Sequence, residues 1–322
     1  METITLPSGG LTSRLGFGGT VLKGGIGKDD NLRLLQSAYA AGVRHFDVAP
    51  SYGLGVAEGI LGEFLQGVRD SVTVTTKVGI PRPSNPGMLA NLRTVIRPFL
   101  AFAPGIRRRL GRSVYKMSVS GPRFDIDQVK TSVAESLRHL RTDHVDVLLL
   151  HELTAADVSE ELQRFLEDAL RRGMILNYGV GSLREDAEAV VQACPGLTGI
   201  LQTSWSAGDE PLDFSPQRPF VITHGAMKPF SQFSAWLKSD RERLKRLSAA
   251  LSEDLASASV LADLMMAAAL AQNPDGMVLV SSTRPERFAR HAALVENTEL
   301  LNRGRTFAEL LRAEKPEARV TA

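Results

Sequence analysis

The sequence predicts an α/β protein with the (β/α)8 architecture, the TIM barrel, and three observations lead to this prediction. Short runs rich in β-branched residues alternate with longer segments of helical periodicity, a pattern typical of repeated βα units around a parallel sheet. Eight such runs occur, which is the number that closes a barrel. A doubly wound sheet instead requires a glycine fingerprint directly after its first strand, and neither 16–20 nor 53–55 has that spacing.

A short β-hairpin is expected before the barrel, because residues 3–6 and 11–14 flank the turn sequence Pro7-Ser8-Gly9-Gly10. We expect this hairpin to cover the barrel floor. The predicted strands are residues 15–18, 43–47, 72–77, 145–150, 175–180, 199–203, 220–223 and 277–280. The predicted crossover helices include residues 31–41, 57–65, 129–140, 160–172, 185–193 and 285–295. Residues 1–322 are therefore expected to form a single barrel domain.

Two connections between strands are much longer than one helix requires. The first is an insertion loop after the third strand, over about residues 79–124, and the second follows the seventh strand, over about 225–256. Both leave from carboxyl ends of strands, where barrel enzymes carry their sites, so we expect lids or specificity loops. We interpret the basic residues of the first loop as a solvated rim, with recognition of an acidic substrate or contact with an anionic membrane as alternatives. These residues are Arg82, Arg93, Arg97, Arg107, Arg108, Arg109, Arg112 and Lys116.

Composition and charge argue against several classes of protein. The 322 residues are 43% hydrophobic and 23% charged, as in a globular chain with a full core. A formal net charge of +2 is too small for a general nucleic-acid-binding protein. No signal peptide is predicted, and the longest apolar stretch, 256–271, is interrupted by Asp263 and too short to span a bilayer. The single cysteine, Cys194, excludes an internal disulfide and a cysteine metal cluster. We expect a cytoplasmic protein without a metal site.

Four residues with acid–base chemistry lie at or just beyond the carboxyl ends of consecutive predicted strands. Asp47 ends the second strand and Tyr52 follows five residues later in the loop, Lys77 ends the third strand, and His151 directly follows the fourth. Parallel strands of a barrel present their carboxyl ends at one rim. The four side chains are therefore expected to converge there.

The motifs around these four residues resemble the aldo-keto reductases in order and spacing. The motifs are Asp47-Val48-Ala49 followed by Tyr52-Gly53, then residues 58–62, 76–79 and 146–151, and the resemblance runs from residues 15–19 to 285–287. It implies a nicotinamide-dependent oxidoreductase acting on a small carbonyl or alcohol substrate, such as an aldehyde, a ketone or an aldose. It also implies a catalytic tetrad, which this chain matches with Tyr52, Lys77, Asp47 and His151.

The chemistry of carbonyl reduction explains why these residue types belong together. The carbonyl oxygen needs a proton donor whose pKa lies nearer neutrality than the ~10 of a free phenol. An ammonium 4 Å away stabilises phenolate by about 4 kcal/mol at an effective dielectric of 20. We therefore interpret Tyr52 as general acid and base, Lys77 as the group that tunes it, Asp47 as the carboxylate that keeps Lys77 charged, and His151 as the donor that orients the substrate oxygen.

The same resemblance implies a cofactor site along the rim. Ser282 and Arg287 match positions that hold a 2′-phosphate, which favours NADP (NADPH) over NAD. Ser182 and Gln202 would hold the nicotinamide carboxamide, and Gly19 and Thr20 would contact the cofactor after the first strand. The chain departs from the family pattern at four of these cofactor-binding positions. A lysine is replaced by Ser281, and a Ser-Asn pair by Gly181-Ser182. The ring-stacking aromatic falls on His224, whose flat imidazole would stack more weakly on the cofactor, and the adenine-reading asparagine falls on His291.

The residues also allow two other functions. The changes at Ser182, His224 and His291 permit an NADP(H)-binding regulatory or sensor protein with little turnover. Lys77 could alternatively act as the nucleophile of a Schiff-base lyase, although Asp47 argues against this by keeping the amine protonated. The specific substrate and the oligomeric state do not follow from the sequence.

Overall fold

The structure is a computed structural model that describes residues 1–23, 28–83 and 124–314. Eight parallel strands close into a barrel in the order β10-β3-β4-β5-β6-β7-β8-β9. The predicted (β/α)8 barrel is therefore confirmed, and every predicted strand overlaps an observed one. The strands are β3 (Leu15–Gly18), β4 (His45–Asp47), β5 (Thr73–Val78), β6 (Val147–His151), β7 (Tyr178–Gly181), β8 (Ile200–Ser204), β9 (Phe220–His224) and β10 (Met277–Val280).

The predicted hairpin is also present and closes the floor of the barrel. Strands β1 (Thr3–Thr5) and β2 (Leu11–Ser13) pair antiparallel. Leu6, in the hairpin turn, is 2% exposed and packs inside the barrel against Val147, Leu149 and other inward-facing apolar side chains. The alternate residues of the same strands, such as Leu148, face outward into the core between the barrel and its helices.

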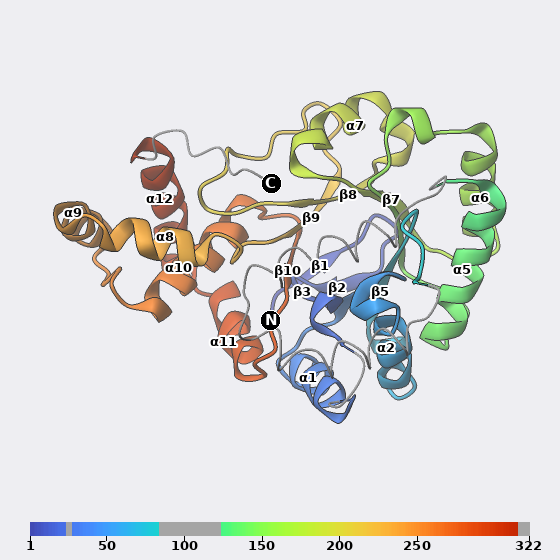
Figure 1. Ribbon diagram of the computed structural model, residues 1–322, viewed down its shortest axis with the longest axis horizontal. Coiled ribbons are helices and arrows are strands. Elements are labelled where there is room, and N and C mark those ends of the chain that lie inside the picture. Colours follow the sequence, from blue (N-terminus) through green and yellow to red (C-terminus); the bar gives the residue numbers. More distant parts are fainter. Residues whose placement is uncertain (24–27, 84–123, 315–322) are drawn as a thin grey trace.

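Helices surround the strands and cover the outer face of the barrel (Figure 1). Helix α6 shows why such segments fold: Leu162, Leu166 and Ala169 form one buried stripe, and Ser159 caps the first turn by accepting from the Leu162 amide. The helices are α1 (Lys28–Ala40), α2 (Ala57–Leu65), α5 (Ile126–Leu140), α6 (Glu160–Arg171), α7 (Ala187–Ala193), α8 (Phe230–Lys238), α9 (Arg241–Leu251), α10 (Ala258–Gln272), α11 (Glu286–Val295) and α12 (Thr298–Glu314).

The long connection predicted after the seventh strand follows β9, and it is largely helical. It contains helices α8 and α9, and these gather with α10 and α12 on one side of the barrel (Figure 1). Helices α10 and α12 approach closely at Gly304, where a Cβ would lie 2.5 Å from the Ala268 nitrogen. Within the described ranges, every helix is too short or too polar to cross a membrane.

The insertion after β5 falls mostly outside the described residues, which leave out 84–123. Seven of the eight basic residues assigned to a solvated rim lie in that part: Arg93, Arg97, Arg107, Arg108, Arg109, Arg112 and Lys116. The eighth, Arg82, is described and contradicts the assignment. Its side chain is only 12% exposed and is paired with Glu58.

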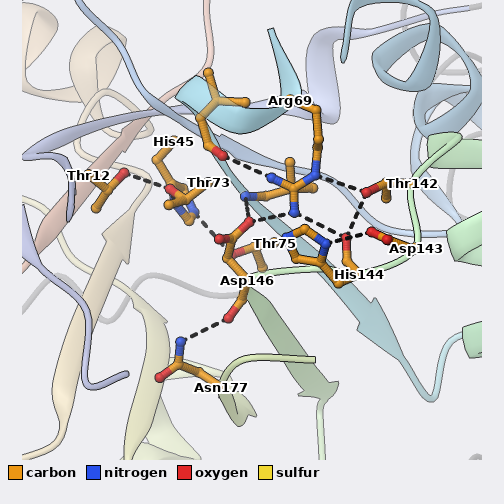
Figure 2. Close-up of polar contacts among 12 residues, drawn as sticks. Thr12, His45, Arg69, Thr73, Thr75, Thr142, Asp143, His144, Asp146 and Asn177 are labelled. Carbon is orange, nitrogen blue, oxygen red and sulfur yellow. Dashed lines mark hydrogen bonds and ion pairs between the residues drawn. The ribbon is translucent and has the colours of Figure 1, made fainter. Parts of the chain in front are cut away.

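Figure 2 shows a network of polar contacts that includes the buried residues His45, Thr73 and Thr75. The ring of His45, which is fully buried, lies between two hydroxyls of β5, with Nδ1 2.8 Å from Oγ1 of Thr73 and Nε2 3.0 Å from Oγ1 of Thr75. Thr12 of the hairpin extends the network, with its Oγ1 2.6 Å from that of Thr73. The buried imidazole is thus satisfied by neutral hydroxyls.

The burial of His45 makes the free energy of unfolding depend on pH. Burial lowers the pKa of His45 to about 4, against the opposing charges of Asp47 and Asp146. The unfolded chain, with a histidine pKa of about 6.5, therefore binds the proton first as the pH falls. The contribution of His45 is complete above pH ~6.5 and is lost between ~6.5 and ~4, a loss of about 3 kcal/mol.

Urea unfolding across that pH range measures this effect. The free energy of unfolding should fall less for His45→Gln, which cannot titrate, than for the wild-type protein. The prediction fails if the two proteins lose the same free energy between neutral and mildly acidic pH.

Candidate active site

The two-residue period of the strands builds a layer of polar side chains at the carboxyl-end rim. Successive side chains of a strand point to opposite faces. Asp47 follows the inward-facing His45 by two residues on β4, and His151 follows the inward-facing Leu149 by two on β6. Lys77 has the equivalent position on β5. Strand geometry alone therefore directs all three into the mouth of the barrel.

Asp47 and Lys77 form a buried ion pair in this layer. The ammonium Nζ of Lys77 donates to Oδ1 and Oδ2 of Asp47 at 2.7 and 2.6 Å, and also lies 3.3 Å from the Val48 carbonyl. The Lys77 and Asp47 side chains are 1% and 3% exposed. An ammonium has three protons, so these three acceptors satisfy it and compensate for its removal from water.

The pKa of Lys77 reflects two opposing effects. Burial is the larger effect and lowers the pKa from its ordinary value, while the charge of Asp47, its hydrogen bond and the charge of Glu58 raise it. The neighbouring carboxylates therefore favour the charged amine in a place where burial disfavours it.

Tyr52 lies at the rim because the chain makes a tight turn after β4. It begins the short 3₁₀ helix η2 (Tyr52–Leu54), and three successive residues are left-handed, with φ of 62° at Gly53, 61° at Leu54 and 93° at Gly55. A Cβ on Gly53 would lie 2.3 Å from the Leu22 carbonyl oxygen. Glycine is therefore required there, and Leu54 adopts a conformation that costs a non-glycine residue roughly 1–2 kcal/mol.

The turn places the Tyr52 ring over Lys77 and beside His151. Nζ of Lys77 lies 5.3 Å from the centroid of the Tyr52 ring. The His151 ring meets the Tyr52 ring edge-on, with centroids 6.4 Å apart and an angle of 85° between the planes. Tyr52 and His151 are partly exposed, whereas the ion pair with Asp47 lies buried beneath them. The structure thus brings together the four residues expected to converge.

Gln202 forms a hydrogen bond with Asp47 that was not predicted from the sequence. Its Nε2 donates to Oδ2 of Asp47 at 2.7 Å, and the side chain is buried. The two residues are 155 positions apart, so local motifs say nothing about the contact. Strand alternation could have found it, because Gln202 follows the inward-facing Ile200 by two residues on β8. The bond gives Asp47 a second side-chain donor besides Lys77.

The other residues expected around the nicotinamide lie on neighbouring strand ends. Ser182 is buried after β7, and its Oγ donates to the Leu183 carbonyl at 3.1 Å. His224 ends β9 with an exposed side chain. After β3, Gly19 begins the short helix η1 (Gly19–Val21), and the hydroxyl of Thr20 donates to Oγ of Ser281 at 3.3 Å. Hydroxyls thus link the ends of β3 and β10 along the rim.

The start of α11 has a donor set that suits a phosphate. Ser282 is buried and its Oγ accepts from the Arg284 amide at 3.1 Å. Arg287 is exposed and forms no ion pair with any described residue. Guanidinium groups at a helix N-terminus bind phosphate through charge, hydrogen bonds and the helix dipole.

His291 adds an observation that points to a ligand. The residue is 6% exposed, and its Nδ1 has no hydrogen-bond partner among the described residues. Burial lowers its pKa to about 4, so the ring is neutral at physiological pH. A buried polar atom without a partner costs free energy unless a ligand or water completes it. Together with the donors of α11, this atom fits the nucleotide end of NADP.

The chain is similar in sequence to proteins of a known family. The family model described as the aldo/keto reductase family matches residues 14–196, which is more than half of the chain. A D-threo-aldose 1-dehydrogenase from Pseudomonas sp. is 31% identical over 166 residues, or 50% of this chain and 46% of that protein. A 6-dehydroglucose reductase from Agrobacterium fabrum is 29% identical over 153 residues, or 47% and 42%. The matched stretch therefore spans less than half the length of these curated relatives.

Solved structures resemble this chain over nearly its whole length. An aldo-keto reductase from Bacillus halodurans in its holo form superposes with a TM-score of 0.71 at 20% identity, covering 99% of each chain. An aldo-keto reductase from Klebsiella pneumoniae in complex with NADPH gives a TM-score of 0.65 at 18% identity, covering 100% of this chain and 98% of that one. At this level of identity the likeness establishes the barrel architecture.

Proposed function

This chain belongs to the aldo-keto reductase family, and on that premise we propose that it is an NADP-dependent oxidoreductase that interconverts a small carbonyl compound and its alcohol. The observation that carries the proposal is the position of the Lys77 ammonium, which is held by both oxygens of Asp47 and lies 5.3 Å from the Tyr52 ring centroid. No other described phenol has a buried ammonium beneath it.

The proposed chemistry divides between cofactor and side chains. NADPH, when bound, would supply a hydride to the carbonyl carbon. Tyr52 donates a proton to the carbonyl oxygen as negative charge develops there, and it accepts that proton in the reverse reaction. The positive charge of Lys77, 5.3 Å from the ring centroid, stabilises the phenolate that remains. His151 donates a hydrogen bond that orients the same oxygen.

The environment of Lys77 opposes its use as a nucleophile. A Schiff base forms through the lone pair of a neutral, accessible amine. Here Nζ has three acceptors, and the side chain is 1% exposed. The regulatory alternative is likewise not favoured, because the curated relatives carry the names of dehydrogenases and reductases.

The substrate class we propose is a polar aldehyde, ketone or aldose. Two relatives are named for aldose or glucose derivatives, which supports a hydroxylated carbonyl compound. The composition, with a net charge of +2 and one cysteine, supports a cytoplasmic protein that does not bind nucleic acid.

Two measurements test the proposal together. Fluorescence titrations with NADPH and NADH establish which cofactor binds, and a panel of aldehydes, ketones and aldoses then tests turnover through the loss of nicotinamide absorbance. We expect binding of NADPH and oxidation of it by at least one carbonyl of the panel. Tight binding without turnover on any substrate would instead favour a regulatory role.

Cofactor selectivity gives a sharper prediction at α11. Arg287→Leu removes the exposed guanidinium proposed to pair with the 2′-phosphate, so the Kd for NADPH should rise by roughly tenfold or more, as for the loss of a charge-assisted hydrogen bond. The Kd for NADH, which lacks that phosphate, should change little. Arg164→Leu, on the exposed face of α6, is the matched control. Equal weakening of both cofactors would argue against a 2′-phosphate contact.

A further inference from the structure

A second buried ion pair lies directly behind the turn that carries Tyr52. Glu58, in the first turn of α2, is fully buried, and its Oε1 accepts from Oγ1 of Thr76 at 2.5 Å. Its other oxygen accepts from the guanidinium of Arg82. The Arg82 and Glu58 side chains are 12% and 0% exposed. A carboxylate withdrawn so completely from water persists because both of its oxygens are satisfied.

Arg82 connects this pair to the turn itself. Its Nη2 donates to Glu58 while Nη1 donates to the carbonyl of Gly55. Gly55 closes the turn, since its amide donates to the Tyr52 carbonyl at 3.0 Å. One planar guanidinium therefore holds a fixed carboxylate and the end of the turn that begins at Tyr52. Lysine cannot reproduce this, because it lacks the rigid fork of donors.

Strand β5 links the pair to the ammonium of the site. Thr76 and Lys77 are consecutive, so their side chains point to opposite faces of the sheet. Lys77 faces inward onto Asp47, whereas Thr76 faces outward onto Glu58. The same strand therefore fixes the ammonium on one side and the anchor of the Tyr52 turn on the other.

We propose that Glu58 and Arg82 are positioning residues for Tyr52, which hold the turn so that the phenol stays over the Lys77 ammonium. This role rests on the proposed function, in which Tyr52 exchanges a proton with the substrate oxygen. The left-handed backbone at Leu54 supports it, because a non-glycine residue keeps such a conformation only where its surroundings impose it. The charge of Glu58 also raises the pKa of Lys77, so Glu58 itself favours the charged amine.

The test is the titration of the Tyr52 phenol. The chain contains four tyrosines, so labelling with tyrosine carrying ¹³C at Cζ yields few signals, and the loss of one in Tyr52→Phe assigns it. In Arg82→Met the Gly55 carbonyl is released. We expect the Tyr52 signal to shift, its pKa to rise by about one unit and kcat to fall about tenfold. The Kd for NADPH should stay within about twofold, since the contacts of Arg82 are to Gly55 and Glu58 and not to the proposed phosphate donors Ser282 and Arg287.

Two further variants separate positioning from stability. Removing one member of a buried pair is destabilising because the other charge remains, whereas removing both is tolerated better. The double variant Glu58→Gln/Arg82→Met should therefore unfold at a urea concentration closer to that of the wild type than Arg82→Met does. Its Tyr52 signal should nevertheless remain shifted, as in Arg82→Met. Arg246→Met, which breaks the pair between Arg246 and Glu314 on the outer helices, should leave that signal unchanged.

The outcomes distinguish this role from the proposed function. An unchanged Tyr52 signal in Arg82→Met and in the double variant would overturn the proposal and leave the pair a purely structural element; the double variant decides if the single one does not fold. A wild-type protein without turnover, whose Tyr52 signal still shifts in these variants, would refute the reductase proposal but retain the positioning role.

Discussion

Tyr52→Phe is expected to lower kcat by about 10²- to 10⁴-fold, the contribution of a well-placed general acid, while the Kd for NADPH stays nearly unchanged. The substitution removes the hydroxyl and retains the ring, which lies over Lys77 and against His151. The turn and the ion pair beneath it are therefore preserved. Steady-state kinetics on the best carbonyl of the panel, together with a fluorescence titration of NADPH, measure both quantities.

A second tyrosine offers the matched control. Tyr39 lies on α1, outside the barrel, and its hydroxyl is 3.1 Å from Oγ of Ser71. Tyr39→Phe removes the same atom far from the rim and should leave kcat unchanged. A Tyr52→Phe enzyme with the turnover of the wild type would refute the assignment of the proton donor.

Lys77→Met is expected to remove turnover to a similar extent and also to destabilise the fold by about 3–5 kcal/mol. The loss of turnover follows because the phenol no longer has a cation beneath it. The loss of stability follows because the buried Asp47 carboxylate remains with Gln202 as its side-chain donor and without a counter-charge. Urea unfolding and kcat measured on the same preparation report the two effects.

The double variant Asp47→Asn/Lys77→Met distinguishes these effects. It removes both charges, so the free energy of unfolding should recover much of the loss, while turnover should stay low because the ammonium is still absent. Lys130→Met, at an exposed lysine of α5, controls for the substitution itself. Recovery of turnover in the double variant would contradict the proposed role of Lys77.

Much of the fold was predictable because barrel strands follow simple rules. The strand segments, the hairpin at the floor and the convergence of Asp47, Tyr52, Lys77 and His151 follow from runs of β-branched residues and from the common rim of parallel strands. The two-residue period extends this reasoning, since it also directs Gln202 into the same layer.

The features that were missed depend on contacts between distant segments. The hydrogen bond from Gln202 to Asp47 crosses the barrel. Helix α12 can pack closely on α10 because Gly304 has no side chain at the contact. Arg82 was misread for a related reason. A basic residue in a predicted loop is usually solvated, and only the fold reveals that Glu58 lies buried within its reach.

The pKa of the Tyr52 phenol, followed by ¹³C NMR in the wild type and in Lys77→Met, tests the central claim most directly. If the ammonium held by Asp47 makes Tyr52 a proton donor, the phenol titrates below the ordinary value of ~10 in the wild type and returns to that value or higher in Lys77→Met. Titration near 10 in both proteins would show that the cation beneath the ring does not tune the phenol.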